Sequence, residues 1–545
     1  MKNIFKLILI FCSINSFAQR TVGLIDYNSP NENGYVLFSP IPSFNTYLID
    51  KCGEKIHEWA STYRPALSVY LLNDGSLLRT GDANNSVFTS GGSGGIIEKF
   101  DWNGNLLWSY TISDSNQCQH HDIAPLPNGN ILVIVWDRYD SAQAVANGKN
   151  LSATNAYLWS EKIIELQPVG TNSANIIWEW KLWEHLVQEF DSTKLNYDTV
   201  SNHPELVNIN YFNGPPTSQD WIHFNSIDYN STLDQILISS HNLCEIWVID
   251  HSTTTAQAAT HTGGNSGKGG DILYRWGNPQ VYGRGIATDK KLFGQHHATW
   301  IPNGFPNAGK ILVFNNGLNR PVGNYSSLDM IETPIDITNQ YPIGATTSFL
   351  PTNLFWTYTA PVPTDFYGSS ISGAYPLQNG SFMIANGQKG TFFEIDSMKQ
   401  TIWKYINPVN NTGTLSQGTT PTANTVFRCN FYSPTFPGLI GQTLTPLGEI
   451  ELNPIVPSIC DSLMNEIDEI TFSNSISIYP NPSNNFIYIS KAENNFEVEI
   501  INTLGKSESI FKNTSTINVS NLSGGIYFLK INSDKNNFIW KFIKQ

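Results

Sequence analysis

A short phrase of alternating aromatic and polar residues recurs six times along the chain. Within each copy apolar and polar side chains alternate, which is typical of a strand that buries one face. The copies read HEW at 57–59, WSY at 108–110, WEW at 178–180, YRW at 274–276, WTY at 356–358 and WKY at 403–405. A strand that repeats in this way indicates an architecture assembled from many copies of one small sheet.

A second phrase, an Asn-Gly or Asp-Gly pair followed by a β-rich run, accompanies the first. It occurs at 73–78, 127–132, 302–304 and 378–382. Such pairs favour the positive φ angles of tight hairpin turns. Six units of this kind predict an all-β protein whose main part is a six-bladed β-propeller, in which each blade is a four-stranded sheet.

Composition supports this architecture. The chain has 41 Gly, 29 Pro and 12% aromatic residues but only 14% charged ones, which suits short strands joined by turns and disfavours helical bundles and disorder. Long inserts near residues 140–160, 185–220 and 255–290 make the unit spacing uneven, and the spacing in 177–190 also permits a short helix. The net charge of −14, without basic runs, excludes nucleic acid as a partner and requires any anion site to be built locally.

The 545 residues are too many for one core, so at least two domains are expected. Residues 1–18 have the positive start, short apolar run and small cleavage-site residues of a secretory signal peptide. We expect the propeller to occupy 19–455, followed by a linker at 456–473 and a β-rich domain at 474–545. Five cysteines remain after the signal, and export favours one or two disulfides with at least one cysteine left over.

The tail opens with YPNP at 479–482, continues with GGIY at 524–527 and ends in basic residues. It resembles the C-terminal sorting domain of the type IX secretion system. The resemblance implies a small C-terminal β-sandwich that outer-membrane export machinery recognises. The protein is therefore expected to cross the inner membrane and then to be secreted or displayed on the cell surface, with that machinery as a partner.

Histidines mark the candidate site. Gln-His-His stands at 119–121 and again at 295–297, and a Pro-Asn-Gly turn follows each copy. A third histidine lies in the phrase 220–227. Equivalent positions of different blades surround one axis, so these histidines are expected to converge at the mouth of the central channel.

These phrases resemble the arylsulfate sulfotransferase family over nearly all of residues 20–455. Further matching phrases are 236–240, 247–251, 274–279 and 310–317. Membership implies a six-bladed propeller that needs no cofactor, neither a metal nor a nucleotide donor. It also implies an enzyme that moves a sulfuryl group from a phenolic sulfate ester, the aryl sulfate donor, to a phenolic acceptor through a sulfohistidine.

The family motifs assign roles to individual residues. The nucleophile corresponds to His296, with His297 as the alternative because the doubled histidine blurs the register. His121 and His223 correspond to the two supporting catalytic histidines. These types suit the chemistry, because neutral imidazole is a nucleophile near pH 7 while a second imidazole protonates the leaving phenolate and positioned donors stabilise the sulfuryl oxygens.

One position departs from the family. The family places an arginine after a Ser-Ser pair, and in this chain His241 follows Ser239-Ser240. The change removes a fixed cation that binds sulfate bidentately. His241 is therefore a weaker anion contact, and His120 and His297 are expected to support the catalytic residues from behind.

Three other functions fit the same residues. Converging histidines could bind zinc or copper in a metalloprotein. A catalytically silent propeller on the cell surface could bind a glycan or a protein. Water as acceptor would make the protein a sulfate-ester hydrolase. The remaining histidines are assigned elsewhere, with a structural role for His57 and surface positions for His185, His203, His251 and His261.

Overall fold

Antiparallel sheets make up almost all of the computed structural model, which describes residues 20–28, 31–150, 157–211, 219–456, 458–461, 477–490, 496–502, 506–533 and 537–545. They divide into two units, one ending at Ile459 and one beginning at Cys460. The predicted signal peptide, and most of the predicted linker, lie outside the described residues. Among the described residues, no helix is long and apolar enough to cross a membrane.

The first unit contains six sheets, the blades of a propeller, whose strands follow one another from the innermost outward. Blade 1 contains β29 (Val426–Tyr432), β2 (Tyr35–Pro40), β3 (Asn45–Asp50) and β4 (Lys55–Ala60). Blade 2 contains β5 (Pro65–Leu71), β6 (Leu77–Asp82), β7 (Gly95–Phe100) and β8 (Leu106–Thr111). Blade 3 contains β9 (Gln117–Pro125), β10 (Ile131–Asp140), β11 (Tyr157–Val169) and β12 (Ser173–Lys181).

Blade 4 contains β15 (Phe224–Asn230), β16 (Gln235–Ser240), β17 (Glu245–Asp250) and β18 (Tyr274–Trp276). Blade 5 contains β19 (His296–Trp300), β20 (Ile311–Asn315), β21 (Ser327–Ile331) and β22 (Trp356–Tyr358). Blade 6 contains β23 (Gly373–Pro376), β24 (Phe382–Asn386), β25 (Thr391–Ile395), β26 (Thr401–Ile406) and β1 (Gly23–Tyr27). The inner strands contact one another in a closed ring, β5 to β9, β15, β19, β23, β29 and back to β5.

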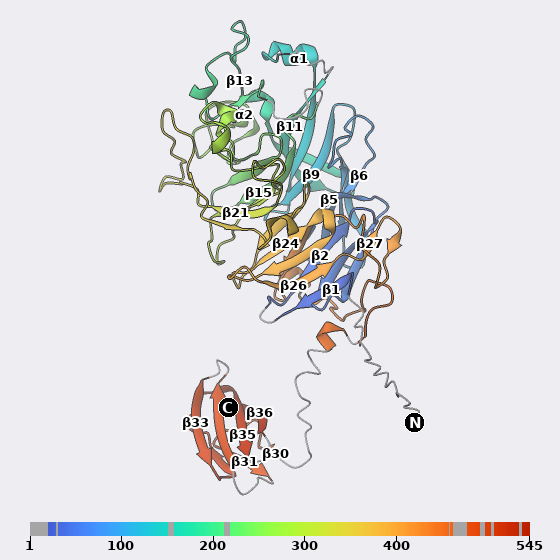
Figure 1. The fold of residues 1–545 in the computed structure, drawn as a ribbon, viewed down its shortest axis with the longest axis vertical. Coiled ribbons are helices and arrows are strands. Elements are labelled where there is room, and N and C mark those ends of the chain that lie inside the picture. Colours follow the sequence, from blue (N-terminus) through green and yellow to red (C-terminus); the bar gives the residue numbers. More distant parts are fainter. Residues whose placement is uncertain are drawn as a thin grey trace, which may run out of the picture. The chain divides into compact units, whose positions relative to one another are not determined.

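Both ends of the first unit close this ring. Strand β29, the last of the unit, is the inner strand of blade 1 and pairs with β2. Strand β1, the first of the unit, pairs with β26 at the outer edge of blade 6. Figure 1 shows the blue strands of the beginning beside the orange strands of the end. Closure joins the first and last blades without an open seam between them, which stabilises the ring as a whole.

The repeats in the sequence correspond directly to the blades. The six aromatic phrases lie in the outer strands β4, β8, β12, β18, β22 and β26. The turn phrases join the first and second strands of blades 2, 3, 5 and 6, where Gly75, Gly129, Gly304 and Gly380 have φ between 81° and 88°. A tight turn with positive φ requires glycine at that position. The predicted six-bladed propeller is confirmed.

The inserts between strands contain short elements. These are α1 (Ser141–Ala146), α2 (Thr255–Ala258), β13 (Leu186–Val187), β14 (Val207–Asn208), β27 (Val409–Asn410), β28 (Gly413–Thr414) and the 3₁₀ turns η1 (Leu182–Glu184), η2 (Val200–Asn202), η3 (Pro279–Tyr282), η4 (Ala287–Asp289), η5 (Pro363–Asp365), η6 (Gly387–Lys389) and η7 (Pro437–Leu439). The helix permitted by the spacing in 177–190 does not form. That segment continues β12 and ends in η1, because Trp178 and Trp180 are buried in the outer strand of blade 3.

The second unit consists of two sheets. One contains β30 (Ser477–Tyr479), β31 (Phe486–Ser490) and β34 (Thr516–Asn518), and the other contains β33 (Ser507–Lys512), β32 (Phe496–Asn502), β35 (Gly525–Ser533) and β36 (Asn537–Lys544). Ile487, Val498 and Leu529 are fully buried in a core to which both sheets contribute. This arrangement confirms the predicted C-terminal β-sandwich.

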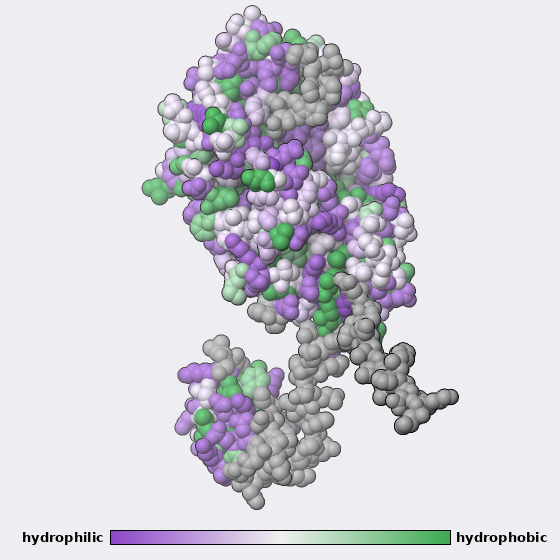
Figure 2. All heavy atoms as spheres, viewed as in Figure 1, coloured by the Kyte–Doolittle hydropathy of each residue, from purple (hydrophilic) through white to green (hydrophobic). Residues whose placement is uncertain are grey.

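The cysteines are divided between a bonded and a free state. Cys52 and Cys460 are disulfide-bonded, whereas Cys118 and Cys429 carry buried thiols. The surface is mixed in character. On the face of the first unit shown in Figure 2, apolar side chains occur in small groups among polar ones. Small scattered groups of this kind are normal for a protein surface in water.

Candidate active site

The predicted histidines stand where three inner strands begin, and the backbone there is irregular. β9, β15 and β19 each lose register with the next strand at this point. His121, His223 and His297 have φ of 50°, 56° and 46°. Positive φ is uncommon for residues other than glycine and costs about 1–3 kcal/mol. Such bulges reorient side chains and are frequent at functional sites.

Five of the six predicted residues form a continuous row of rings. Ring centroids are 5.2 Å apart for His120 and His121, and 4.5 Å apart for His121 and His223. They are 5.3 Å apart for His223 and His241, and 5.1 Å apart for His241 and His296. The row joins blades 3, 4 and 5, as the sequence predicted for histidines at equivalent positions.

His297 does not belong to the row. Its ring lies 4.6 Å from that of Tyr375, and the backbone N–H of Ala374 donates to its Nδ1 over 3.2 Å. Both partners belong to blade 6, on the opposite side of His297 from blade 4. His296 and His297 are therefore separated by the bulge between them, and only the ring of His296 reaches the other histidines.

Asn316 fixes the proton on His296. The Asn316 amide nitrogen donates to the carbonyl oxygens of Gly368, at 2.7 Å, and Ile371, at 3.0 Å, so its Oδ1 is the group that faces His296. His296 Nδ1 lies 2.9 Å from that oxygen and must carry the hydrogen. Nε2 therefore has the lone pair, and it accepts a bond of 3.1 Å from the N–H of Ile371.

His223 is held by a carboxylate. Its Nδ1 lies 2.5 Å from Oδ2 of Asp220, which is 3% exposed. Burial would raise the pKa of Asp220, but the charge and hydrogen bond of His223 lower it overall. The ionised carboxylate therefore stabilises the imidazolium form of His223, and it leaves Nε2 free to exchange a proton.

A chain of three side chains orients His121. His120 Nδ1 lies 2.9 Å from His121 Nδ1, and His120 Nε2 lies 2.8 Å from Oε2 of Glu161. Burial, followed by the charge of Asp220, raises the pKa of Glu161 well above its usual value. The Glu161–His120 pair then retains a proton, so His120 donates to His121 Nδ1 and the N–H of His121 lies on Nε2. Trp136 stacks on His120 at 4.0 Å and fixes its plane.

Burial keeps the row uncharged. It lowers the pKa of His296 well below 6.5, and His241 next to it adds to the effect. It also lowers the pKa of His121, with the charge of His223 as the next cause. Burial and then His223 lower the pKa of His241 to about 4. His241 is therefore neutral at physiological pH and does not replace the charge of the family arginine.

Polar residues from every blade fill the channel next to the histidines. Arg428 donates to Asp122 Oδ2 over 2.7 Å and to the carbonyl oxygen of Asn225 over 2.8 Å. The hydroxyl of Tyr70 donates to the other oxygen of Asp122 over 2.8 Å. One residue comes from each inner strand, namely Tyr70, Asp122, Asn225, His297, Tyr375 and Arg428. The ion pair fixes the relative positions of the blades that carry the histidines.

Several residues of the site were not predicted from the sequence. Asp220 stands in a matching phrase, three positions before His223, but it received no role. Asn316, Glu161 and Arg428 are 20, 41 and 306 positions from their partners in the site. Of these three, only Asn316 lies in a phrase that matched the family, so that phrase was the one available signal for them.

The other histidines differ partly from their predicted places. His57 stacks on Trp102 at 4.5 Å, in keeping with a structural role, and His261 is 60% exposed, as predicted. His203 is 31% exposed. Surface positions are wrong for His185, which is fully buried, and for His251, whose side chain is 12% exposed. Both are buried because their rings bond to carboxylates distant in sequence.

The site histidines do not group as a metal centre. Among the described residues, the side chains that bring three metal-binding atoms within 4.8 Å of one another are those of His185, His261 and Asp271. These residues lie in the inserts of blades 3 and 4, outside the row. The structure therefore gives the metal-binding alternative no support at the channel mouth.

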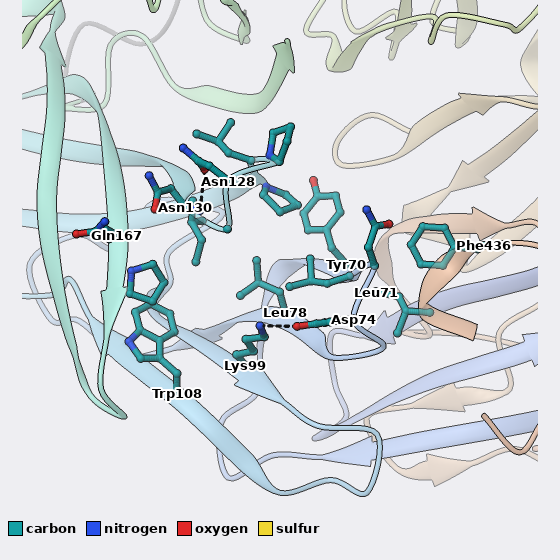
Figure 3. Close-up of a pocket in the computed structure, with 18 of the residues that line it drawn as sticks. Tyr70, Leu71, Asp74, Leu78, Lys99, Trp108, Asn128, Asn130, Gln167 and Phe436 are labelled. Atoms are coloured by element: carbon teal, nitrogen blue, oxygen red, sulfur yellow. Dashed lines mark hydrogen bonds and ion pairs between the residues drawn. The ribbon is translucent and has the colours of Figure 1, made fainter. Parts of the chain in front are cut away.

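A cavity of about 730 Å³ lies at the other ends of the inner strands, where β5 and β9 run into their turns (Figure 3). Trp108, Tyr70 and Phe436 line it, and Lys99 forms an ion pair of 2.9 Å with Asp74 at its edge. The described residues that line it include none of the six predicted histidines. The cavity is therefore separate from the row.

Similarity to a known family decides the class of protein. The Arylsulfotransferase (ASST) family matches residues 43–428, which contain all six histidines. The chain belongs to the arylsulfotransferase family. A secretion system C-terminal sorting domain matches residues 477–545, which indicates export and a secreted or cell-surface location for this arylsulfotransferase. No curated protein matches the chain.

Solved structures resemble this arylsulfotransferase at low identity. A Bacteroides caccae protein of unknown function is 13% identical with a TM-score of 0.39, covering 73% of this chain and 98% of its own. Virginiamycin B lyase from Staphylococcus aureus is 11% identical with a TM-score of 0.33, covering 73% and 87%. Hydrazine synthase from Kuenenia stuttgartiensis is 12% identical with a TM-score of 0.30, covering 57% and 71%. These values carry no argument about activity.

Proposed function

We propose that this arylsulfotransferase moves the sulfuryl group of a phenolic sulfate ester to a second phenol through a sulfohistidine on His296. The observation that supports this most is the bond from His296 Nδ1 to an acceptor-only oxygen of Asn316, which places a neutral lone pair on Nε2. Burial and the neighbouring His241 lower the pKa of His296, so this lone pair is available near neutral pH.

In the first step, the Nε2 lone pair attacks the sulfur of the donor. An N–S bond forms while the S–O bond to the aromatic ring breaks, and the phenolate leaves with that bond's electron pair. His223, held as an imidazolium by Asp220, gives its Nε2 proton to the phenolate. The sulfohistidine retains its Nδ1 hydrogen bond to Asn316.

In the second step, the acceptor phenol attacks the same sulfur and gives its proton to His223. The N–S bond breaks and its electron pair returns to Nε2 of His296. The sum exchanges one sulfate ester and one phenol for another ester and phenol, so no water or nucleotide is consumed. Asp220 serves both steps because it stabilises the protonated form of His223 that begins and ends the cycle.

Two donors stabilise the charge on the sulfuryl oxygens. The Nε2–H of His121 is set by the chain through His120 to Glu161. The N–H of Ile371, which bonds to His296 Nε2 in the free protein, turns to a sulfuryl oxygen when the sulfur takes its place. Ile371 has a φ of 47°, so its backbone is held in an unusual conformation beside the nucleophile.

We propose the same domain limits as the sequence predicted, with catalysis in 19–455, a linker at 456–473 and export directed by 1–18 and 474–545. The type IX secretion machinery is the proposed partner of the tail. Its sorting function is separate from catalysis, because the family match ends at residue 428.

A turnover assay tests the proposed function. The full chain is incubated with a chromogenic aryl sulfate and chelator, without a nucleotide donor and with or without a phenol. We expect release of the chromophore that depends on the phenol, together with the sulfated phenol as product. Release that is independent of the phenol would indicate a hydrolase, loss in chelator a metalloenzyme, and no release a silent binding propeller.

Replacing Asn316 with leucine should lower kcat by about 10²-fold and change KM by less than about 2-fold. The leucine removes the acceptor that keeps the hydrogen on Nδ1 of His296. Asn315→Leu is the matched control for folding, because Asn315 is equally buried but bonds to Asp329. Steady-state kinetics of both variants measure the effect, and equal losses in both would show that Asn316 acts only through stability.

Replacing His241 with arginine should lower KM for the aryl sulfate by about 10-fold, because a charge-assisted hydrogen bond replaces a neutral one. The pKa of His241, lowered to about 4 by burial and by His223, leaves the native residue without charge at pH 7. His241→Gln, which is also neutral, should keep KM near the native value. A KM that is the same in the arginine and glutamine variants would exclude position 241 from the donor site.

A further inference from the structure

Two histidines and an aspartate that the proposed reaction does not use converge in the inserts of blades 3 and 4. His185 follows η1, His261 lies in the loop after α2, and Asp271 precedes β18. Nδ1 of His185 lies 2.9 Å from Oδ1 of Asp271, and Nδ1 of His261 lies 2.7 Å from the same oxygen. Three side chains from separate segments thus direct their metal-binding atoms at one point.

The hydrogen on His185 is fixed, as in a metal-binding histidine. Its Nε2 lies 2.8 Å from the carbonyl oxygen of Ala258, which accepts hydrogen bonds and never donates them, so Nε2 carries the hydrogen. In the neutral ring, Nδ1 then directs a lone pair at a carboxylate. A cation between these atoms turns that repulsion into attraction. Histidines that bind metals usually donate their other N–H to a carbonyl or carboxylate in this way.

The protein holds these atoms in place. His185 is fully buried, and its ring lies parallel to that of Trp180 at 5.7 Å. Trp180 Nε1 donates over 2.7 Å to the carbonyl oxygen of Gly270, the residue before Asp271. One tryptophan therefore orients both buried members of the group, whereas His261, at 60% exposed, leaves a path for an ion to enter.

We propose that His185, His261 and Asp271 bind one divalent transition-metal ion, with Zn²⁺ as the ion that they fit best. Two imidazole nitrogens and one carboxylate oxygen match the ligand types of zinc and disfavour calcium and magnesium, which prefer oxygen ligands alone. A fourth position remains for water. It faces a cavity of about 330 Å³ lined in part by His261, Trp183, Tyr197, Asp198 and His203.

The ion joins the insert that contains His185 to the loop of blade 4 that contains His261 and Asp271. Without it, Trp180 and the bond to Ala258 still hold His185, but His261 can move with its exposed loop. Bound metal should therefore raise the unfolding temperature, because an ion that binds only the folded chain stabilises it.

Zinc titration of the full chain, purified without a polyhistidine tag and freed of metal by chelator, tests this site. Calorimetry measures stoichiometry and affinity, and cobalt absorption reports a four-coordinate site with nitrogen and oxygen ligands. We expect His261→Gln and Asp271→Asn each to remove one equivalent of bound Zn²⁺ and the associated rise in unfolding temperature. His203→Gln, which changes a histidine on the same cavity that also contacts carboxylates, should retain both.

Zinc that also binds the row of site histidines would remain in all three variants, so the difference of one equivalent is the decisive quantity. His261 is exposed, so its substitution should leave the fold intact, and circular dichroism checks this for each variant. Equal Zn²⁺ binding by the native chain and the His261→Gln variant would overturn the proposal, as would no binding by the native chain.

Discussion

Replacing His296 with alanine is expected to lower kcat/KM for aryl sulfate transfer by about 10⁴-fold or more, the size of effect seen when an enzyme loses its nucleophile. Nε2 of His296 has a lone pair with a fixed direction, because Asn316 holds the hydrogen on Nδ1. His241 has a comparable amide partner in Asn242, but the family's nucleophile motif corresponds to His296. Steady-state assays with a chromogenic donor measure the loss.

His297→Ala is the matched control, since it removes the same side chain from the adjacent position. His297 contacts Tyr375 and Ala374 rather than the row, so its substitution should change kcat/KM by less than about 10-fold once folding is confirmed. A larger loss in His297→Ala than in His296→Ala would assign the nucleophile to His297 and reverse the register that we propose.

Replacing Asp122 with asparagine should lower the free energy of unfolding by about 3–5 kcal/mol, because it leaves the Arg428 charge buried without its partner. Both side chains are at most 4% exposed. Asp122 also accepts bonds from Tyr70 and from the backbone of Ile123 and Ile227. Urea unfolding followed by tryptophan fluorescence measures the change.

The double variant Asp122→Asn, Arg428→Met separates the ion pair from the other bonds of Asp122. Because the unpaired charge is gone, it should lose less stability than the sum of the two single variants. A loss below about 1 kcal/mol for Asp122→Asn alone would show that water screens the pair. Equal losses for Asp122→Asn and the double variant would place the cost in the bonds to Tyr70 and the backbone.

The propeller could be predicted because its information is local and repeated. Each outer strand has its own aromatic phrase, and hairpins between first and second strands have an Asn-Gly or Asp-Gly pair whose glycine adopts positive φ. Ring closure was not predicted. The pairing of β1 with β26 and of β2 with β29 joins residues almost 400 positions apart, and neither strand has a motif that names its partner.

The row of histidines could be predicted because the same phrase recurs in two blades and a related one in a third. What orients the histidines could not, because Asn316, Glu161 and Arg428 act across long loops and between blades. The same reason explains the wrong placement of His185. An isolated histidine in an insert gives no sign of Asp271, which lies 86 positions away.

The most direct test of the proposed mechanism is to detect the sulfohistidine itself. The full chain is mixed with an aryl sulfate without acceptor, quenched in alkali to preserve the N–S bond, digested and analysed by mass spectrometry. We predict a peptide heavier by one sulfuryl group, with the group on His296, that disappears when a phenol is added before quenching. Turnover without any modified peptide, or with the sulfuryl group on a residue other than His296, would contradict the proposed mechanism.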